Sequence, residues 1–177
     1  MTRFFGVWSQ LRTCKDRPCR HGGHCIEKTP DLRDSNGFRC DCGFGFSGPT
    51  CEMPIPPYVP FGNSFFKLSD SKMMWNQSKA ACEEEGAHLA VVPDSATNDF
   101  LKHLINTTYE GFPSSHWIGV KRLKECNYTT IHGFTDWAPG QPVCNYDCVH
   151  LWSASNLMWD DTDCKHLFNY ICEITFF

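Results

Sequence analysis

Twelve cysteines in a chain of 177 residues constrain this sequence more than any other feature. The number is even and far above ordinary usage, and such a density is typical of proteins that fold in an oxidising compartment. Zinc binding is the competing interpretation, but the two closest cysteines, Cys40 and Cys42, are separated by one residue. That spacing suits a tetrahedral metal site poorly, because structural zinc sites place about two to four residues between paired cysteines. We therefore expect a secreted, disulfide-bonded, extracellular protein.

Composition and motifs exclude several classes of protein. The formal net charge of −4 and a hydrophobic share of 41% suit a globular chain and lack the basic excess of nucleic-acid binders. No stretch is apolar for long enough to span a membrane, and no N-terminal apolar run indicates a signal peptide, so we expect the export signal to lie outside this sequence. Nucleophile-elbow, His-Glu-x-x-His and phosphate-loop motifs are missing, which predicts a protein that is not an enzyme.

The cysteines fall into two groups, which predicts two domains. The first six lie between Cys14 and Cys51, a segment too short to bury a sufficient core, so disulfides must hold it together. Six cysteines allow about 15 connectivities, and their spacing alone does not choose among them. Four prolines between Pro54 and Pro60 predict a stiff, extended connector. The expected organisation is an N-terminal segment at 1–13, a small disulfide-rich module at 14–51, a linker at 52–60 and a larger domain at 61–177.

The larger domain has the pattern of an α+β fold. A helix is expected over 75–85, ended by Gly86, and a second helix begins after a cap at Asp94 or Ser95. The core face of the second helix is Phe100, Leu101, Leu104 and Ile105. Short strands are expected at 65–68, 88–92, 117–120 and 170–173. An irregular region follows the third strand to about Asn156, and a loop of that length in a compact domain is usually functional.

The first group of cysteines resembles the EGF-like module. The spacing is C-x4-C-x5-C-x14-C-x-C-x8-C, with Gly22-Gly23 before Cys25 and Gly45-Phe46-x-Gly48 before Cys51. The resemblance implies two small antiparallel hairpins and the disulfides Cys14–Cys25, Cys19–Cys40 and Cys42–Cys51. It also implies a spacer or a unit that takes part in cell adhesion.

The larger domain is similar to the C-type lectin-like domain over nearly all of residues 61–177. The matching positions are Trp75-x6-Cys82-x3-Gly86-Ala-His-Leu89, Trp117-Ile-Gly119, Trp137, Pro139-Gly140, Cys148, Trp159, Cys164 and Tyr170-Ile-Cys172. The resemblance implies two helices, antiparallel sheets, a long loop region and the disulfides Cys82–Cys172 and Cys148–Cys164. Cys126 and Cys144 remain; we expect them to pair, the alternative being a link to another chain. The order of the two modules resembles that of matrix proteoglycans of the lectican type.

Lectins of this type hold a sugar through calcium, which takes about 6–8 oxygen ligands. The resemblance implies that Gln141, Asp160 and Asp161 would ligate calcium, because they match the family's ligand positions. Two other positions do not fit: Val143 has no side-chain oxygen, and Tyr146 is a poor calcium ligand. The alternative role for Asp160 and Asp161 is to accept hydrogen bonds from backbone amides or to pair with Lys and Arg.

The auxiliary calcium site of the family is expected to be weaker still. Lys121 and Arg122 stand where acidic residues are usual, and cations there oppose a divalent ion, although Asp147 retains one carboxylate. Together with Lys124 they either meet an anionic ligand or form a solvated face. Among the loop aromatics, we assign Trp137 and Trp159 to packing and Tyr146 to an exposed ligand contact.

These observations favour an extracellular recognition or adhesion protein that binds a protein or glycan without the usual calcium-dependent sugar site. The alternative is a calcium-dependent lectin, galactose-leaning, that uses Gln141, Asp160 and Asp161. In either case Tyr146, Asp147, Lys121 and Arg122 are candidate ligand-binding residues, and calcium is at most weakly bound. Three sequons predict N-glycosylation at Asn76, Asn106 and Asn127.

Overall fold

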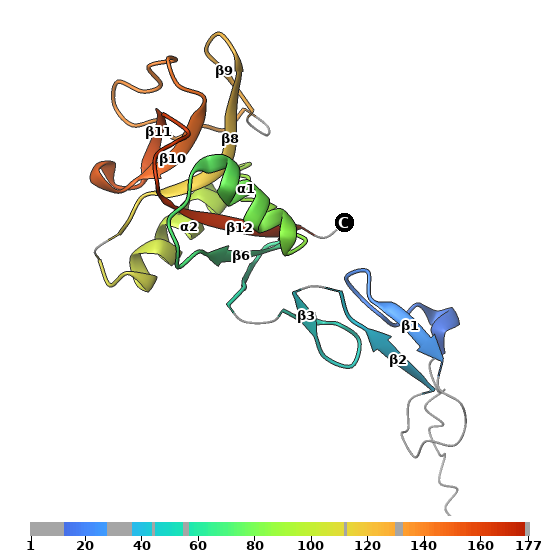
Figure 1. Ribbon diagram of the computed structural model, residues 1–177. Helices are drawn as coiled ribbons and strands as arrows, with labels where there is room; N and C mark the ends of the chain where they lie inside the picture. The colour runs from blue at the N-terminus through green and yellow to red at the C-terminus, as the bar shows by residue number, and fades with distance from the viewer. Residues whose placement is uncertain are drawn as a thin grey trace, which may run out of the picture. The chain divides into compact units, whose positions relative to one another are not determined.

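The computed structural model describes residues 13–27, 37–43, 45–54, 57–111, 113–129 and 133–175 (Figure 1). The chain separates into two compact units, Met1–Ile55 and Pro56–Phe177. Their boundary falls inside the expected linker 52–60, and strands occupy both ends of that segment. Met53–Pro54 forms strand β4 of the first unit, and Val59–Phe61 forms strand β5 of the second. Except for Thr13, the expected N-terminal segment 1–13 lies outside the described residues.

The first unit consists of short elements that are joined by disulfides. Phe38 and Phe46 are its large buried side chains among the described residues, which is little apolar surface for a stable core. Two antiparallel pairs of strands, β1 with β2 and β3 with β4, form the expected hairpins. The elements are η1 (Cys14–Asp16), β1 (His24–Glu27), β2 (Phe38–Asp41), β3 (Phe46–Ser47) and β4, and the disulfides Cys14–Cys25, Cys19–Cys40 and Cys42–Cys51 coincide with the expected pairs.

The second unit is an α+β domain built on one mixed sheet. Its strands run in the order β11-β10-β8-β12-β6-β5, with β7 paired to β12 and β9 paired to β8. The pairing of β8 with β12 is parallel, and the others are antiparallel. The elements are α1 (Trp75–Glu84), α2 (Ser95–Thr108), η2 (Ser153–Ser155), β5, β6 (Ser64–Leu68), β7 (His88–Leu89), β8 (His116–Lys124), β9 (Asn127–Tyr128), β10 (Cys148–Trp152), β11 (Met158–Thr162) and β12 (Asn169–Thr175).

The helix boundaries follow from local chemistry that the sequence already shows. Asp94 precedes α2 in an extended conformation, and its carboxylate accepts a hydrogen bond of 2.8 Å from the Thr97 amide. After α1, Gly86 adopts a φ of 73°, a left-handed conformation that ends helices and that glycine takes without steric cost. Both signals were predicted: α1 ends one residue before the expected end at 85, and α2 begins directly after the expected cap Asp94.

Strand β12 shows how the helices cover the sheet, because successive strand residues point to opposite faces. Ile171 joins the hydrophobic core that contains Leu101 and Ile105 of α2. The next residue, Cys172, is bonded to Cys82 of α1. The two helices therefore pack on opposite faces of β12, and six of its seven residues are buried.

The structure differs from prediction in the region expected to be irregular up to about Asn156. Residues 148–152 form strand β10, which lies between β8 and β11 in the sheet. Because β10 is buried on both faces, its sequence CVHLW does not show the alternation that identifies a half-exposed strand. Asp160 and Asp161, expected in a loop, lie in strand β11. The loop that remains runs from β9 to β10, and its described residues are 129 and 133–147.

Candidate functional site

We call residues 133–147 the binding loop. A disulfide between Cys126, beside strand β9, and Cys144 joins this loop to the β8–β9 hairpin. Cys148, the first residue of β10, is bonded to Cys164. These pairs coincide with the expected ones, and the described cysteines include no free thiol. The binding loop and the hairpin lie together at one end of the domain (Figure 1).

Asp161 organises the centre of the binding loop from strand β11. It is 2% exposed. Its Oδ1 accepts a hydrogen bond of 2.7 Å from the Val143 amide, and its Oδ2 accepts hydrogen bonds from the Tyr128 hydroxyl at 2.9 Å and the Tyr146 amide at 3.4 Å. Burial and the neighbouring Asp161 carboxylate raise the pKa of Tyr128, which keeps its phenol protonated as a donor. Both oxygens of Asp161 are thus engaged by the protein itself.

Asp160 has different partners on the other face of the same strand. It faces His150 of β10 in the strand register, and its Oδ2 lies 3.0 Å from His150 Nε2. The His150 ring is stacked on Phe168, with centroids 4.5 Å apart, and meets the edge of Trp117. The carboxylates of Asp160 and Asp161 therefore do not converge on one point, although they are adjacent in sequence.

Two further candidate calcium positions lie in the binding loop. Gln141 precedes a cis peptide bond to Pro142, and its Oε1 is buried without a hydrogen-bond partner among the described residues. Val143 is 45% exposed, but its side chain has no oxygen that could ligate calcium. Its backbone amide is already donated to Asp161. Nowhere in the described part of the chain do three His, Cys, Asp or Glu side chains gather closely enough to hold a metal ion.

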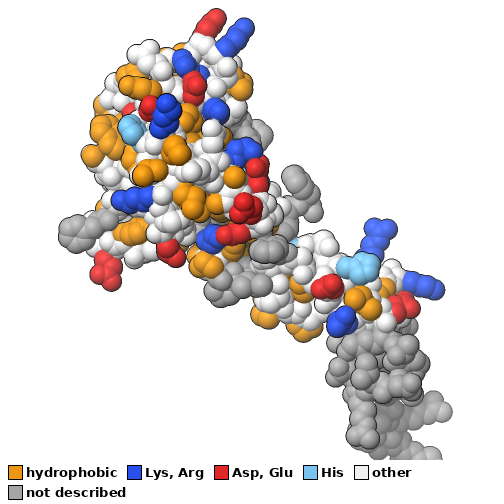
Figure 2. All heavy atoms as spheres, in the orientation of Figure 1, with side chains coloured by type: hydrophobic (Ala, Val, Ile, Leu, Met, Phe, Trp, Pro, Cys, Tyr) orange, Lys and Arg blue, Asp and Glu red, His pale blue; other side chains and the backbone are white. Residues whose placement is uncertain are grey.

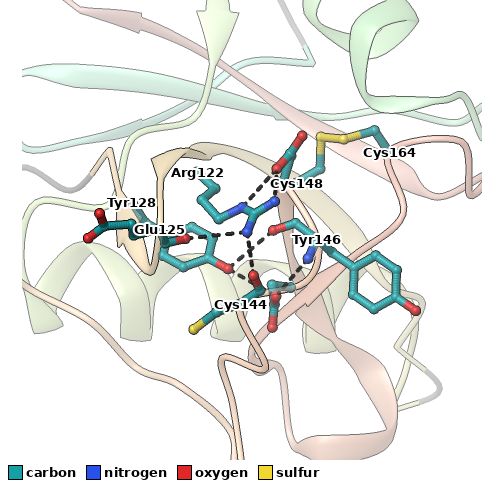
Figure 3. A network of polar contacts seen from close by, with 9 residues as sticks. Arg122, Glu125, Tyr128, Cys144, Tyr146, Cys148 and Cys164 are labelled. Atoms are coloured by element: carbon teal, nitrogen blue, oxygen red, sulfur yellow. Dashed lines mark hydrogen bonds and ion pairs between the residues drawn. A yellow bond between two sulfur atoms is a disulfide. The ribbon is translucent and has the colours of Figure 1, made fainter.

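Arg122 and Asp147 form a second polar network on the outer side of the binding loop (Figure 3). The guanidinium of Arg122 donates from Nε and Nη2 to Asp147 Oδ1, at 2.8 and 2.7 Å. Its Nη1 donates to the carbonyl oxygens of Glu125, at 3.3 Å, and Cys144. Arg122 is therefore committed to the protein rather than to solvent.

The expected basic cluster is not a single surface. Lys121 places its ammonium 5.0 Å from the centre of the Trp75 ring, a cation–π contact, whereas Arg122 contacts Asp147. Only Lys124 is exposed. Acidic and basic side chains are interspersed on the face that Figure 2 shows, without a broad area of one sign. The arrangement favours a mixed surface over an anion-binding stripe.

Exposed apolar side chains lie close in sequence to the two cysteines that join the hairpin to the loop. Tyr146 is 45% exposed, as expected of a ligand contact, and its ring is directed away from the polar network (Figure 3). Leu123 in the hairpin and Val143 in the loop are also exposed, and neither was predicted as a contact. Trp159 is buried and Trp137 packs against it with ring centroids 5.6 Å apart, which matches their assignment to packing.

Sequence reasoning missed Tyr128, which donates a hydrogen bond to Asp161, and His150, which contacts Asp160. No local signal singled out Tyr128, because its role depends on strand β11, 33 residues away. His150 lies in a strand that was expected to be irregular. A test for apolar runs flanked by cysteines could have found that strand, and with it the register that pairs His150 with Asp160.

Comparison with known proteins places this site in a family. Residues 71–174 match the family model of the lectin C-type domain, so the chain belongs to that family. It is 31% identical over 123 residues to hepatic lectin of Gallus gallus, which covers 64% of this chain and 56% of that protein. It is 30% identical over 128 residues to C-type mannose receptor 2 of Homo sapiens, covering 67% of this chain and 8% of the receptor. No family model of an EGF-like domain matches the first unit.

Solved structures give the same fold. The C-type lectin domain of murine dendritic cell inhibitory receptor 2, solved in complex with an N-glycan, is 26% identical with a TM-score of 0.61, covering 70% of this chain and all of that one. Human lithostathine, at 18% identity, has a TM-score of 0.64 over 70% of this chain and 92% of that one. No helix among the described residues is long and apolar enough to cross a membrane. Six disulfides in the chain, three of them in a domain of this family, are consistent with an extracellular location.

Proposed function

We propose that this protein recognises an extracellular protein or glycan through the binding loop of its lectin-like domain, without the usual calcium-dependent sugar site. One observation carries the proposal. Asp161, the buried carboxylate of β11 that the loop contacts, has both oxygens engaged by Val143, Tyr128 and Tyr146. A calcium ion at this carboxylate would have to displace donors of the protein before any sugar could complete its coordination shell.

The remaining candidate ligands support the same conclusion. Asp160 is paired with His150, Asp147 is paired with Arg122, and Val143 has no side-chain oxygen. Calcium sites in proteins depend on several oxygens that point at one centre. The carboxylates here are distributed between both faces of strand β11 and the outer side of the loop, so the residues present do not fit the ion.

The surface proposed to meet the ligand consists of Leu123, Val143 and Tyr146. These side chains are exposed and lie within three residues of Cys126 or Cys144, whose disulfide fixes the hairpin to the loop. An exposed tyrosine offers a rigid aromatic face for a sugar ring or an apolar pocket, with a hydroxyl for a hydrogen bond. A loop held by a disulfide and a buried carboxylate loses little conformational entropy on binding, which favours affinity.

A second candidate function rests on Gln141. Its buried Oε1 has no hydrogen-bond partner in the described part of the chain, which is the one observation that favours a cation. The calcium-dependent, galactose-leaning alternative would use this oxygen with Asp160 and Asp161, and would require His150 and the loop amides to release them.

Two measurements separate these functions. Calorimetric titration of calcium chloride into the folded protein should give no heat of binding. A glycan array, probed with and without a chelator, should give the same pattern of signals under both conditions. Sugar binding that the chelator abolishes would overturn the proposal and establish the calcium-dependent alternative.

For the first unit we propose an EGF-like spacer or adhesive module, supported by its three disulfides and two hairpins. We also propose N-glycosylation at Asn76, Asn106 and Asn127, all of which are exposed. Mass spectrometry of protein secreted from eukaryotic cells, before and after removal of N-glycans, tests the three sites. We expect no enzymatic activity, in keeping with a family of lectin-type domains.

A further inference from the structure

The guanidinium of Arg122 lies where three segments of the chain meet. The carbonyl of Glu125 belongs to the turn between β8 and β9, the carbonyl of Cys144 belongs to the binding loop, and Asp147 immediately precedes strand β10. The backbone adds one more tie, since the Arg122 amide donates to the Asp147 carbonyl at 2.8 Å. The side chain of Arg122 is 24% exposed, whereas that of Asp147 is 53% exposed, so solvent reaches the carboxylate more than the guanidinium.

These oxygen atoms are of the kind that a hard cation attracts. One carboxylate and two backbone carbonyls resemble part of the ligand set of a calcium ion. Carbonyl oxygens that face each other without a positive partner or a donor repel one another and lack hydrogen bonds. A guanidinium answers both needs, because it carries a fixed positive charge and five donors in a planar fork.

We propose that Arg122 positions the binding loop as a built-in cation, and so removes the need for a dissolved ion at this end of the domain. The guanidinium holds the carboxylate of Asp147 and the carbonyls of Glu125 and Cys144 together, and it thereby fixes the loop against the β8–β9 hairpin. The consequence for ligand recognition rests on the proposed function of the loop. The ordering of the loop itself does not.

The same geometry indicates that Arg122 does not contact a ligand directly. Its Nε, Nη1 and Nη2 all donate to oxygens of the protein. Lys124, two residues further along the same strand, is exposed and has no ion pair with another described residue. Arg122 is therefore a positioning residue, and Lys124 is a natural control for the loss of a nearby positive charge.

Hydrogen–deuterium exchange of the intact chain tests this inference without any ligand. Arg122→Met keeps the length of the side chain and removes charge and donors, so exchange in residues 125–126 and 143–147 should accelerate about tenfold, while residues 116–120 of β8 and the whole of β12 exchange as in the wild type. Arg122→Lys should give an intermediate rate, because an ammonium can pair with Asp147 but lacks the planar fork. Asp147→Asn should accelerate exchange less than Arg122→Met, because both carbonyls keep their donor. Lys124→Met should change nothing.

Three results would overturn the inference. They are wild-type exchange rates in Arg122→Met, an Arg122→Lys variant that behaves as the wild type, and a wild-type loop whose exchange slows when calcium chloride replaces chelator. None of these depends on a ligand. If the glycan array instead showed chelator-sensitive binding while Arg122→Met loosened the loop, the proposed function would fail and the positioning role of Arg122 would stand.

Discussion

The binding loop and the region where β6 and β7 pair with β12 each contain contacts to one buried carboxylate. Asp161 is 2% exposed and accepts hydrogen bonds from backbone amides of the loop. Glu173 is 6% exposed. It accepts hydrogen bonds from the Ser64 hydroxyl at 2.6 Å, the Val91 amide at 2.7 Å and the Thr175 hydroxyl at 3.1 Å. In both regions a charge that would be costly to bury is satisfied by donors of the chain itself.

The two regions differ in what else holds them. The segment that Glu173 contacts is also paired by the ladder of β12 with β6 and β7. The binding loop has no ladder between 133 and 147, only an isolated bridge between Trp137 and Trp159. The part of the loop after this bridge depends on Asp161, on the Cys126–Cys144 disulfide and on Arg122. Glu173 therefore adds hydrogen bonds to a region that strand pairing already holds, whereas Asp161 holds a loop that has little strand pairing of its own.

The largest expected effect is that of Asp161→Ala. It would leave the Tyr128 hydroxyl and the amides of Val143 and Tyr146 without their acceptor, and should lower the free energy of unfolding by about 4 kcal/mol. Urea denaturation of intact, oxidised protein measures the change. A loss below about 1 kcal/mol would show that the loop does not depend on this carboxylate and would break the comparison.

The loss of stability in acid is expected to depend on a buried histidine, His116, rather than on Asp161 or Glu173. Burial lowers the pKa of His116 from 6.5 to about 4, and its Nε2 has no hydrogen-bond partner in the described part of the chain. As the pH falls, the unfolded chain takes up this proton first, so stability is lost between pH 6.5 and about 4, by about 3 kcal/mol in total. Urea midpoints across this range should show a flatter dependence in His116→Leu than in the wild type.

His166, which is exposed, supplies the matched control. A His166→Gln variant should keep the acid dependence of the wild type. If His116→Leu retained the full loss of stability between pH 6.5 and about 4, His116 would not be its cause.

Glu173→Gln should have a smaller effect than Asp161→Ala. The amide of glutamine keeps one acceptor oxygen for Val91, and the ladder of β12 remains, so the expected loss is about 2 kcal/mol. Hydrogen exchange should accelerate near Val91 and leave the binding loop unchanged. A loss equal to that of Asp161→Ala would show that strand pairing does not make the Glu173 region less dependent on its carboxylate than the binding loop is.

Tyr146→Ala is expected to change stability least. The side chain is 45% exposed, and the backbone amide of residue 146 can still donate to Asp161. The free energy of unfolding should therefore change by less than about 0.5 kcal/mol. Signals on the glycan array, or capture of a protein ligand found by screening, should nevertheless fall. Leu167→Ala, an exposed apolar position outside the binding loop, should leave those signals unchanged.

The sequence by itself determined the elements whose signals are local. Asp94 and Gly86 marked helix ends, the pattern of tryptophans and cysteines identified the lectin-like domain, and Gln141, Val143 and Tyr146 located the loop where ligands were sought. These features follow from chemistry within a few residues, or from a spacing that the family shares, so they can be read without coordinates.

Only the tertiary structure decided what the charged residues do. Adjacent aspartates in β11 face opposite sides of the sheet, and only the pairing with β10 shows that one meets His150 while the other meets loop amides. Likewise, Arg122 was predicted as part of a basic cluster, but the disulfide and the hairpin turn bring carbonyl oxygens to its guanidinium. The physical reason is that the partner of a charge is set by strand register and chain crossing, which join residues far apart in sequence.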